Sequence, residues 1–114
     1  GKLQIKLNTL THAGLDEVKS SGEFNSLDSK KTIERWAEKE LEEQIFSVIH
    51  KVQKDYHADI FGFGELLHEK MPRTWEKIEK NWVKEFSNVE VVVNSKVIIE
   101  NSAQTTRSIK IHQK

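Results

Sequence analysis

The sequence contains no cysteine, and it has only one proline and five glycines among its 114 residues. The missing cysteines exclude disulfides, thiolate metal sites and a cysteine nucleophile. They do not identify the compartment, because an extracellular domain with an adequate core needs no disulfide. No apolar run approaches the roughly 20 residues of a membrane-spanning helix, and no signal-like segment opens the chain. We therefore expect any membrane contact to depend on an anchor outside these residues.

An excess of charge of one sign is also missing. The 18 basic and 18 acidic residues balance and are interleaved along the chain, so no basic stripe exists to attract phosphate backbones. We expect no nucleic-acid partner. With 36% hydrophobic and 32% charged residues, the chain has the composition of an ordinary folded domain, and its length is enough for a core that needs no metal.

The hydrophobic periodicity predicts an α+β domain, with an antiparallel β-sheet packed against one long amphipathic helix plus two shorter helices. Residues 2–8 alternate like a half-buried strand, and residues 11–24 are weakly patterned, with a short strand expected around Val18. The long helix is expected to end at Tyr56 and to begin after one of three candidate N-caps, which are Ser26, Asp28 and Ser29.

The second half of the chain predicts the two shorter helices and the remaining strands. Asp59 is expected to cap a helix that starts at Ile60, while Pro72 ends that helix and opens the next one. Apolar residues of one parity predict a single long strand over residues 89–100. A turn at residues 101–103 is then expected to return the chain through Ile109 and Ile111.

The same periodicities assign side chains to the core and to the solvent. We expect one mostly buried core, made of Trp36, Ile45, Trp75 and Trp82 together with the strand residues Leu3, Ile5, Val91 and Val93. Four acids of the long helix fall opposite its apolar stripe and are expected to serve solubility: Glu34, Glu38, Glu42 and Glu43.

Residues 57–86 contain fragments of catalytic motifs, but each fragment is incomplete. A dinucleotide-binding loop that began at Gly62 and Gly64 would need a third glycine where Leu67 stands. A zinc-protease pattern that began at His68 would need its second histidine where Pro72 stands. We therefore expect no cofactor, and we assign the two glycines to close packing of the aromatic residues.

Two chemical alternatives stay open beside this interpretation. The first is a small metal-dependent hydrolase that uses His57, Asp59, Glu65 and His68, although these residues do not follow a ligand template. The second is a nutrient-binding pocket beside the aromatic residues, for which the sequence supplies no convergent polar set.

The stretch DIFGFGELLHEKMPRTWEKIEKNWVKEF, residues 59–86, resembles the C-terminal domain of the Ger(x)C family, the C subunits of spore germinant receptors. The residues that carry the resemblance also include flanking positions, and they are Lys51, Gln53, Asp59, Phe61 to Gly64, His68, Pro72, Trp75, Trp82, Phe86 and Val89 to Val93. The order of elements extends the resemblance over about Leu3 to Ile99. One departure is the lack of a glycine in residues 101–103.

The resemblance implies a non-enzymatic subunit on the outer face of the spore inner membrane, where it would act with the integral-membrane A and B subunits. The membrane would be reached through a lipid on an N-terminal cysteine. Since this chain has no cysteine, residues 1–114 are expected to be a single domain excised from the C-terminal end of a larger lipoprotein.

The predicted site residues follow from this identification. Asp59, Gly62, Gly64, Pro72, Trp75 and Trp82 are expected to form a structural motif without catalytic or metal-binding residues. Glu65, Glu69 and Arg73 flank the aromatic residues and are expected to point outward, so we predict that they contact a partner protein.

Overall fold

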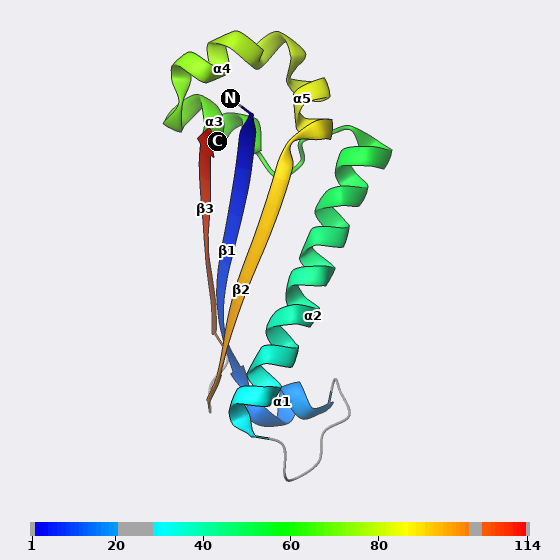
Figure 1. Cartoon of the computed structure of the whole chain (residues 1–114), viewed down its shortest axis with the longest axis vertical. Helices are drawn as coiled ribbons and strands as arrows, with labels where there is room; N and C mark the ends of the chain where they lie inside the picture. The colour runs from blue at the N-terminus through cyan, green and yellow to red at the C-terminus, as the bar shows by residue number, and fades with distance from the viewer. Residues whose placement is uncertain (1, 21–28, 101–103, 114) are drawn as a thin grey trace. The chain divides into compact units, whose positions relative to one another are not determined.

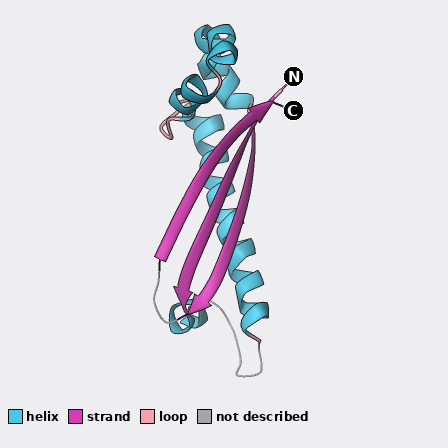
Figure 2. Ribbon diagram, turned by 90° about the vertical axis from the view of Figure 1, so that its left-hand side faces the viewer, coloured by secondary structure: helices cyan, strands magenta, loops and turns pink. Residues whose placement is uncertain are grey.

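The structure, a computed structural model, describes residues 2–20, 29–100 and 104–113. Three strands, β1 (Leu3–Gly14), β2 (Glu90–Glu100) and β3 (Gln104–Gln113), form one sheet in the order β2-β1-β3. Figure 2 shows the three strands side by side in a single layer. The α+β class predicted from the sequence is confirmed.

The sheet is mixed, so the antiparallel expectation applies to only part of it. β3 runs antiparallel to β1 (Figure 1). β1 and β2 are parallel, because residue numbers rise together in the hydrogen bonds that join Gln4 to Glu90 and Thr9 to Ser95. β3 includes Ile109 and Ile111 as expected, but it pairs with β1 instead of β2. The predicted turn at residues 101–103 lies outside the described residues.

The first strand is longer than predicted and is followed by a helix. β1 continues to Gly14, and Val18 belongs to α1 (Leu15–Ser20), so the expected short strand around Val18 is wrong. A single apolar residue between polar neighbours does not distinguish a strand from a helix turn, and tertiary contacts decide the outcome here. Val18 is buried against Ile33, Val97 and Ile99.

The long helix is α2 (Lys30–Lys51), which continues into a π-helical turn, η1 (Val52–Tyr56). Ser29 begins it, because its hydroxyl accepts the Thr32 N–H at 3.1 Å. Ser29 is thus the N-cap among the three candidates; the other two, Ser26 and Asp28, lie outside the described residues. No helix of the described residues is long and apolar enough to cross a membrane.

The second half of the chain contains three short helices, α3 (Phe63–Lys70), α4 (Pro72–Ile78) and α5 (Trp82–Asn88). The predicted helix after Pro72 is present in two pieces, since a 3₁₀ turn, η2 (Glu79–Asn81), separates α4 from α5. β2 is one long strand, as its side-chain parity predicted, with Val91, Val97 and Ile99 buried.

The chain divides into two compact units, and all three strands contribute to both. Unit 1 comprises residues 1–6, 46–92 and 110–114, and unit 2 comprises residues 7–45 and 93–109. Within unit 1, Figure 1 shows α3, α4 and α5 at the end of the strands where both termini lie. The buried apolar side chains of unit 1 are Ile5, Ile49, Val52, Phe63, Leu67, Phe86 and Val91.

Unit 2 contains a row of hydrogen bonds that the sequence did not predict. Three carboxylates of α2 accept backbone N–H groups of the edge strand β2. Glu42 accepts from Ser95 at 2.8 Å, Glu38 from Val97 at 3.0 Å and Glu34 from Ile99 at 2.8 Å. The expectation that these three acids serve solubility is wrong, while the fourth, Glu43, is exposed.

The single core expected for the three tryptophans is also wrong. Trp36 packs against the buried cluster of unit 2, whereas Trp75 and Trp82 belong to unit 1. All three are half-buried, as are Leu3, Ile45 and Val93, while Ile5 and Val91 are buried as predicted.

Candidate functional site

Asp59 connects three segments of unit 1. Its carboxylate accepts the N–H groups of Phe63 at 3.0 Å and Gly64 at 2.7 Å, and also the indole N–H of Trp82 at 3.0 Å. The first two bonds satisfy donors at the start of α3 that have no partner inside the helix. The helix begins at Phe63 and not at Ile60, which is exposed. Asp59 therefore fixes the start of α3 and ties it to α5.

The two glycines of this segment are required for different reasons, so the close packing predicted for both is wrong for Gly62. Gly62 has a φ of 77° in the left-handed region, which glycine adopts without a steric penalty. A Cβ added to Gly64 would lie 2.7 Å from the indole nitrogen of Trp82 and 3.1 Å from the Trp75 ring. The absence of a side chain at Gly64 therefore lets α3 approach both tryptophans.

A chain of ring contacts extends from the buried interior of unit 1 to its surface. We call it the aromatic corner. Neighbouring ring centroids are 5.3 to 6.2 Å apart, in the order Phe61, Phe63, Phe86, Trp82, Trp75 and His68. Phe63 and Phe86 are buried, whereas the His68 ring is exposed and stacks on Trp75. The half-buried tryptophans thus lie between the buried phenylalanines and the exposed His68 ring.

The turn η1 holds the C-terminal end of α5. The side-chain amide of Gln53 donates to the carbonyl oxygens of Phe86 at 2.8 Å and Val89 at 2.9 Å, and Lys54 donates to that of Ser87 at 2.7 Å. Helix C-terminal carbonyls need such external donors. Sequence reasoning missed these roles, although a glutamine on the apolar side of a helix, next to Val52, was a usable signal.

The predicted contact residues Glu65, Glu69 and Arg73 are all exposed, with the two acids on α3 and the arginine on α4. Their side chains form no ion pair with the described part of the chain. We call these three residues the α3 surface. Nothing in the structure tests whether a partner binds there, so this assignment stays a prediction.

The four residues of the metal-dependent alternative are not assembled into a site. Among the described residues, no group of three His, Asp or Glu side chains is arranged to hold a metal ion. Three of the four have contacts of another kind: His57 hydrogen-bonds Ser87 at 2.9 Å, Asp59 caps α3, and His68 stacks on Trp75. The fourth, Glu65, is exposed. The aromatic corner is therefore organised for packing.

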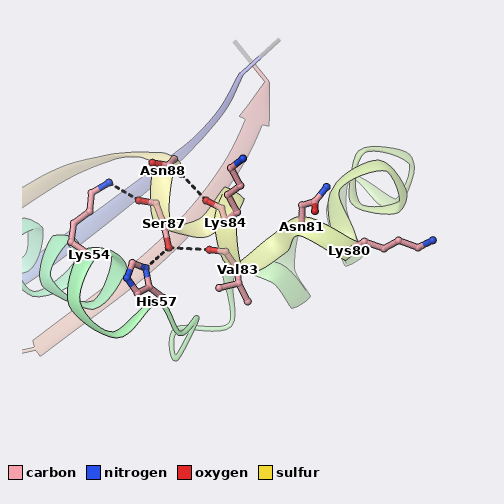
Figure 3. A pocket seen from close by; sticks show the side chains of 8 residues that line it. All are labelled: Lys54, His57, Lys80, Asn81, Val83, Lys84, Ser87 and Asn88. Atoms are coloured by element: carbon pink, nitrogen blue, oxygen red, sulfur yellow. Dashed lines mark hydrogen bonds between the residues drawn. The ribbon is translucent and has the colours of Figure 1, made fainter.

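A hollow of about 520 Å³ lies beside η1 and α5 in unit 1. Figure 3 shows that the His57 ring and the Lys54 ammonium group both point toward Ser87, while the Lys80 side chain extends away from them. The lining also includes Val83 and Lys84. Three cationic side chains, Lys54, Lys80 and Lys84, border this hollow.

Comparison with known proteins places the sequence among proteins of spore germination. The family described as "Spore germination B3/GerAC like, C-terminal" matches residues 1–103. Spore germination protein KC of Bacillus subtilis (strain 168) is 28% identical over 114 residues, which are 99% of this chain and 28% of that protein.

A second relative is spore germination protein YndF of the same strain, 31% identical over 67 residues, which are 59% of this chain and 17% of that protein. The chain therefore spans less than a third of the length of either relative. No solved structure gives a significant match.

Proposed function

Because the chain belongs to the spore germination B3/GerAC-like C-terminal family, we propose that it is the C-terminal domain of a germinant-receptor C subunit and acts by contacting other subunits. In this proposal the domain performs no chemical step. The whole subunit is lipid-anchored at the outer face of the spore inner membrane, and its partners are the integral-membrane A and B subunits.

The observation that carries the proposal is the internal use of polar groups at the aromatic corner. Asp59, the most enclosed carboxylate of the predicted site, accepts three hydrogen bonds from its own chain. In the described residues, no buried side-chain nitrogen or oxygen lacks a hydrogen-bond partner. A catalytic or ligand-binding pocket usually presents convergent polar groups to its ligand, and this corner presents none.

The α3 surface supports contact with a partner for a different reason. Glu65 and Glu69 lie four residues apart on one short helix, and like charges at this spacing destabilise a helix by about 0.2–0.5 kcal/mol. The helix dipole favours an acid in the first turn, where Glu65 lies, so local stability explains Glu65 but not its repulsion from Glu69. A complementary basic surface on a partner would offset the repulsion and would orient the two proteins.

The experiment is charge reversal on the α3 surface of the full-length subunit in spores. The variant is Glu65→Lys, Glu69→Lys and Arg73→Glu, and the measurement is germination in response to nutrients at a confirmed normal level of the subunit. We expect a weakened response, because charge reversal at an interface opposes association.

A matched control reverses two acids and one base elsewhere on the surface. The residues Asp16, Glu43 and Lys39 are exposed and belong to unit 2, so their reversal should leave the response intact. An unchanged response in the α3-surface variant would show that this surface is not the contact.

A further inference from the structure

We propose that the hollow beside η1 and α5 binds a phosphate-type oxyanion. We call the residues Lys54, His57, Lys80, Lys84 and Ser87, which line it, the lysine groove. This inference goes beyond subunit contact, since it concerns a ligand and a surface separate from Glu65, Glu69 and Arg73.

The first argument is the local excess of positive charge. The chain as a whole is neutral, yet three lysines line this one hollow, and no acidic residue of the described chain does. Lys80 and Lys84 have no carboxylate partner in the described residues. A cationic lining without acids attracts an anion, and the attraction between opposite charges acts over several ångströms near the surface.

The second argument is the number of free donors. An ammonium group has three donors, and Lys54 uses one of them for the Ser87 carbonyl at 2.7 Å. That bond holds the Lys54 side chain at the groove while two N–H groups remain. Lys84, on α5, adds a further ammonium group. The backbone there is held by a hydrogen bond of 2.9 Å that the Asn88 side-chain amide donates to the Lys84 carbonyl oxygen.

The third argument concerns His57, the one non-glycine residue with positive φ in the described chain, at φ 51°. This conformation is uncommon outside glycine, and it persists when the surroundings impose it. It follows directly on the π-helical turn η1, a rare element that is frequent at functional sites. The backbone here is therefore held in a costly shape that directs the imidazole toward Ser87.

The hydrogen bonds around His57 determine which ring nitrogen is free. The Ser87 hydroxyl donates to the Val83 carbonyl at 2.9 Å, so it accepts from His57 Nδ1 at 2.9 Å. Nδ1 therefore carries a proton and Nε2 is left for a ligand. Nε2 accepts the hydroxyl proton of a monoprotonated phosphate when the ring is neutral, and it donates to a phosphate oxygen when the ring is protonated.

These groups fit a phosphate better than a carboxylate. Arginine forms the bidentate pairs that match a carboxylate, whereas lysine acts as a point charge and is a common phosphate ligand. The groove has no arginine. A phosphate monoester carries a charge of about −1.5 to −2 at neutral pH. Several lysines match this charge more closely than they match the single negative charge of a carboxylate. Inorganic phosphate and the phosphate-monoester headgroup of phosphatidic acid share this chemistry.

The test measures phosphate binding to the 114-residue chain and to two triple variants of equal net charge. Inorganic phosphate is titrated at low ionic strength, and the backbone amide shifts of His57, Lys84 and Ser87 are followed by NMR. The groove variant carries Lys54→Gln, Lys80→Gln and Lys84→Gln. The control carries Lys39→Gln, Lys70→Gln and Lys77→Gln at exposed positions outside the groove.

We expect saturable shifts at the groove and a loss of affinity of at least about tenfold in the groove variant, because each charge-assisted bond contributes on that scale. Lys84→Gln alone removes no side-chain bond seen within the described chain, and it should weaken binding severalfold without affecting the fold. An equal loss in the control variant, or shifts that map elsewhere, would overturn the proposal.

Vesicle sedimentation distinguishes the two sources of phosphate. Groove-dependent binding to vesicles of phosphatidic acid in phosphatidylcholine, and not to phosphatidylcholine alone, assigns the groove to a lipid headgroup. Binding of inorganic phosphate without vesicle binding assigns it to a free phosphate. If neither probe binds through the groove, the proposal is wrong.

Discussion

At the scale of single residues, Asp59 has the widest influence on unit 1. Its two carboxylate oxygens accept N–H groups from α3 and from the Trp82 indole, which is 23 positions away in sequence. A serine at this position has one oxygen and a shorter side chain. It can replace one cap bond, but it cannot also reach the indole.

We predict that Asp59→Ala lowers the free energy of unfolding by about 2–3 kcal/mol, because it leaves several donors of a charge-assisted cluster without their acceptor. Asp59→Ser should recover less than half of that loss. Chemical denaturation of the purified variants measures both values. Combining each with Trp82→Phe gives a double-mutant cycle, and strictly additive effects would contradict a bond between Asp59 and Trp82.

A second residue-scale prediction concerns Gly64. Gly64→Ala should destabilise the chain by about 1–3 kcal/mol, the usual range for overpacking, because the new Cβ would lie 2.7 Å from the Trp82 indole nitrogen. Gly14→Ala is the matched control, since its Cβ would meet only Glu17 atoms at 3.7 Å or more. Thermal unfolding compares the two, and equal stability would argue against close packing at Gly64.

Residue type predicted part of this arrangement. An aspartate ahead of an apolar helical pattern indicated a cap. Close packing was predicted for both glycines but holds only for Gly64, since a Cβ at Gly62 would meet nothing within 4 Å. The bond from Trp82 to Asp59 was beyond reach, because no local pattern specifies which distant donor a carboxylate meets. For the same reason the role of Gln53, which binds carbonyls more than 30 positions away, was missed.

At the scale of elements, the glutamate row of α2 protects the edge of the sheet in unit 2. Four helical residues rise about 6 Å and two strand residues about 6.6 Å, so Glu34, Glu38 and Glu42 stay in step with every second N–H of β2. An uncovered edge strand invites pairing with another chain. The row therefore satisfies backbone donors and blocks this edge.

We predict that Glu38→Ala lowers the free energy of unfolding by about 1–3 kcal/mol, since the Val97 N–H loses its acceptor. Glu38→Gln keeps an acceptor oxygen and should lose less, and Glu43→Ala, at an exposed position, should change little. Hydrogen exchange at the Val97 amide gives the local readout. If Glu38→Ala leaves both stability and this exchange rate unchanged, the row does not stabilise the edge.

Element types were predicted more successfully than element partners. The parity of β2 and the stripe of α2 are local patterns that reflect burial. The parity was correct, whereas the stripe was correct only in part, because Val48 and Tyr56 are exposed. The glutamate row had the spacing of an ordinary solvated helix face, so its contact with β2 had no signature in the helix alone. Val18 was misassigned because α1 is only six residues long and shows no full helical period.

At the scale of the whole molecule, the order of the strands follows in part from the connections between them. Parallel neighbours need a long crossover connection, and the helical residues between the first strand and the second provide one. The α2 glutamates occupy the outer edge of β2. The free edge of β1 therefore remains for β3 to pair with. Such a choice is set by tertiary contacts and not by local periodicity.

The proposed function also belongs to this scale, because it concerns what the chain contacts. The chemical alternative has its own test in the full-length subunit in spores. If His68→Ala with Glu65→Gln abolished germination while abundance and assembly stayed normal, a chemical role for these side chains would replace the contact role. We expect this pair to leave assembly nearly unchanged, since neither substitution reverses a charge.

The most direct test of subunit contact is co-isolation of the A and B subunits with the full-length C subunit from spore membranes. We predict that Glu65→Lys, Glu69→Lys and Arg73→Glu together lower the amount of co-isolated partner about tenfold or more, while the control reversal at Asp16, Glu43 and Lys39 does not. Undiminished recovery of both partners with the α3-surface variant, at normal subunit abundance, would contradict the account.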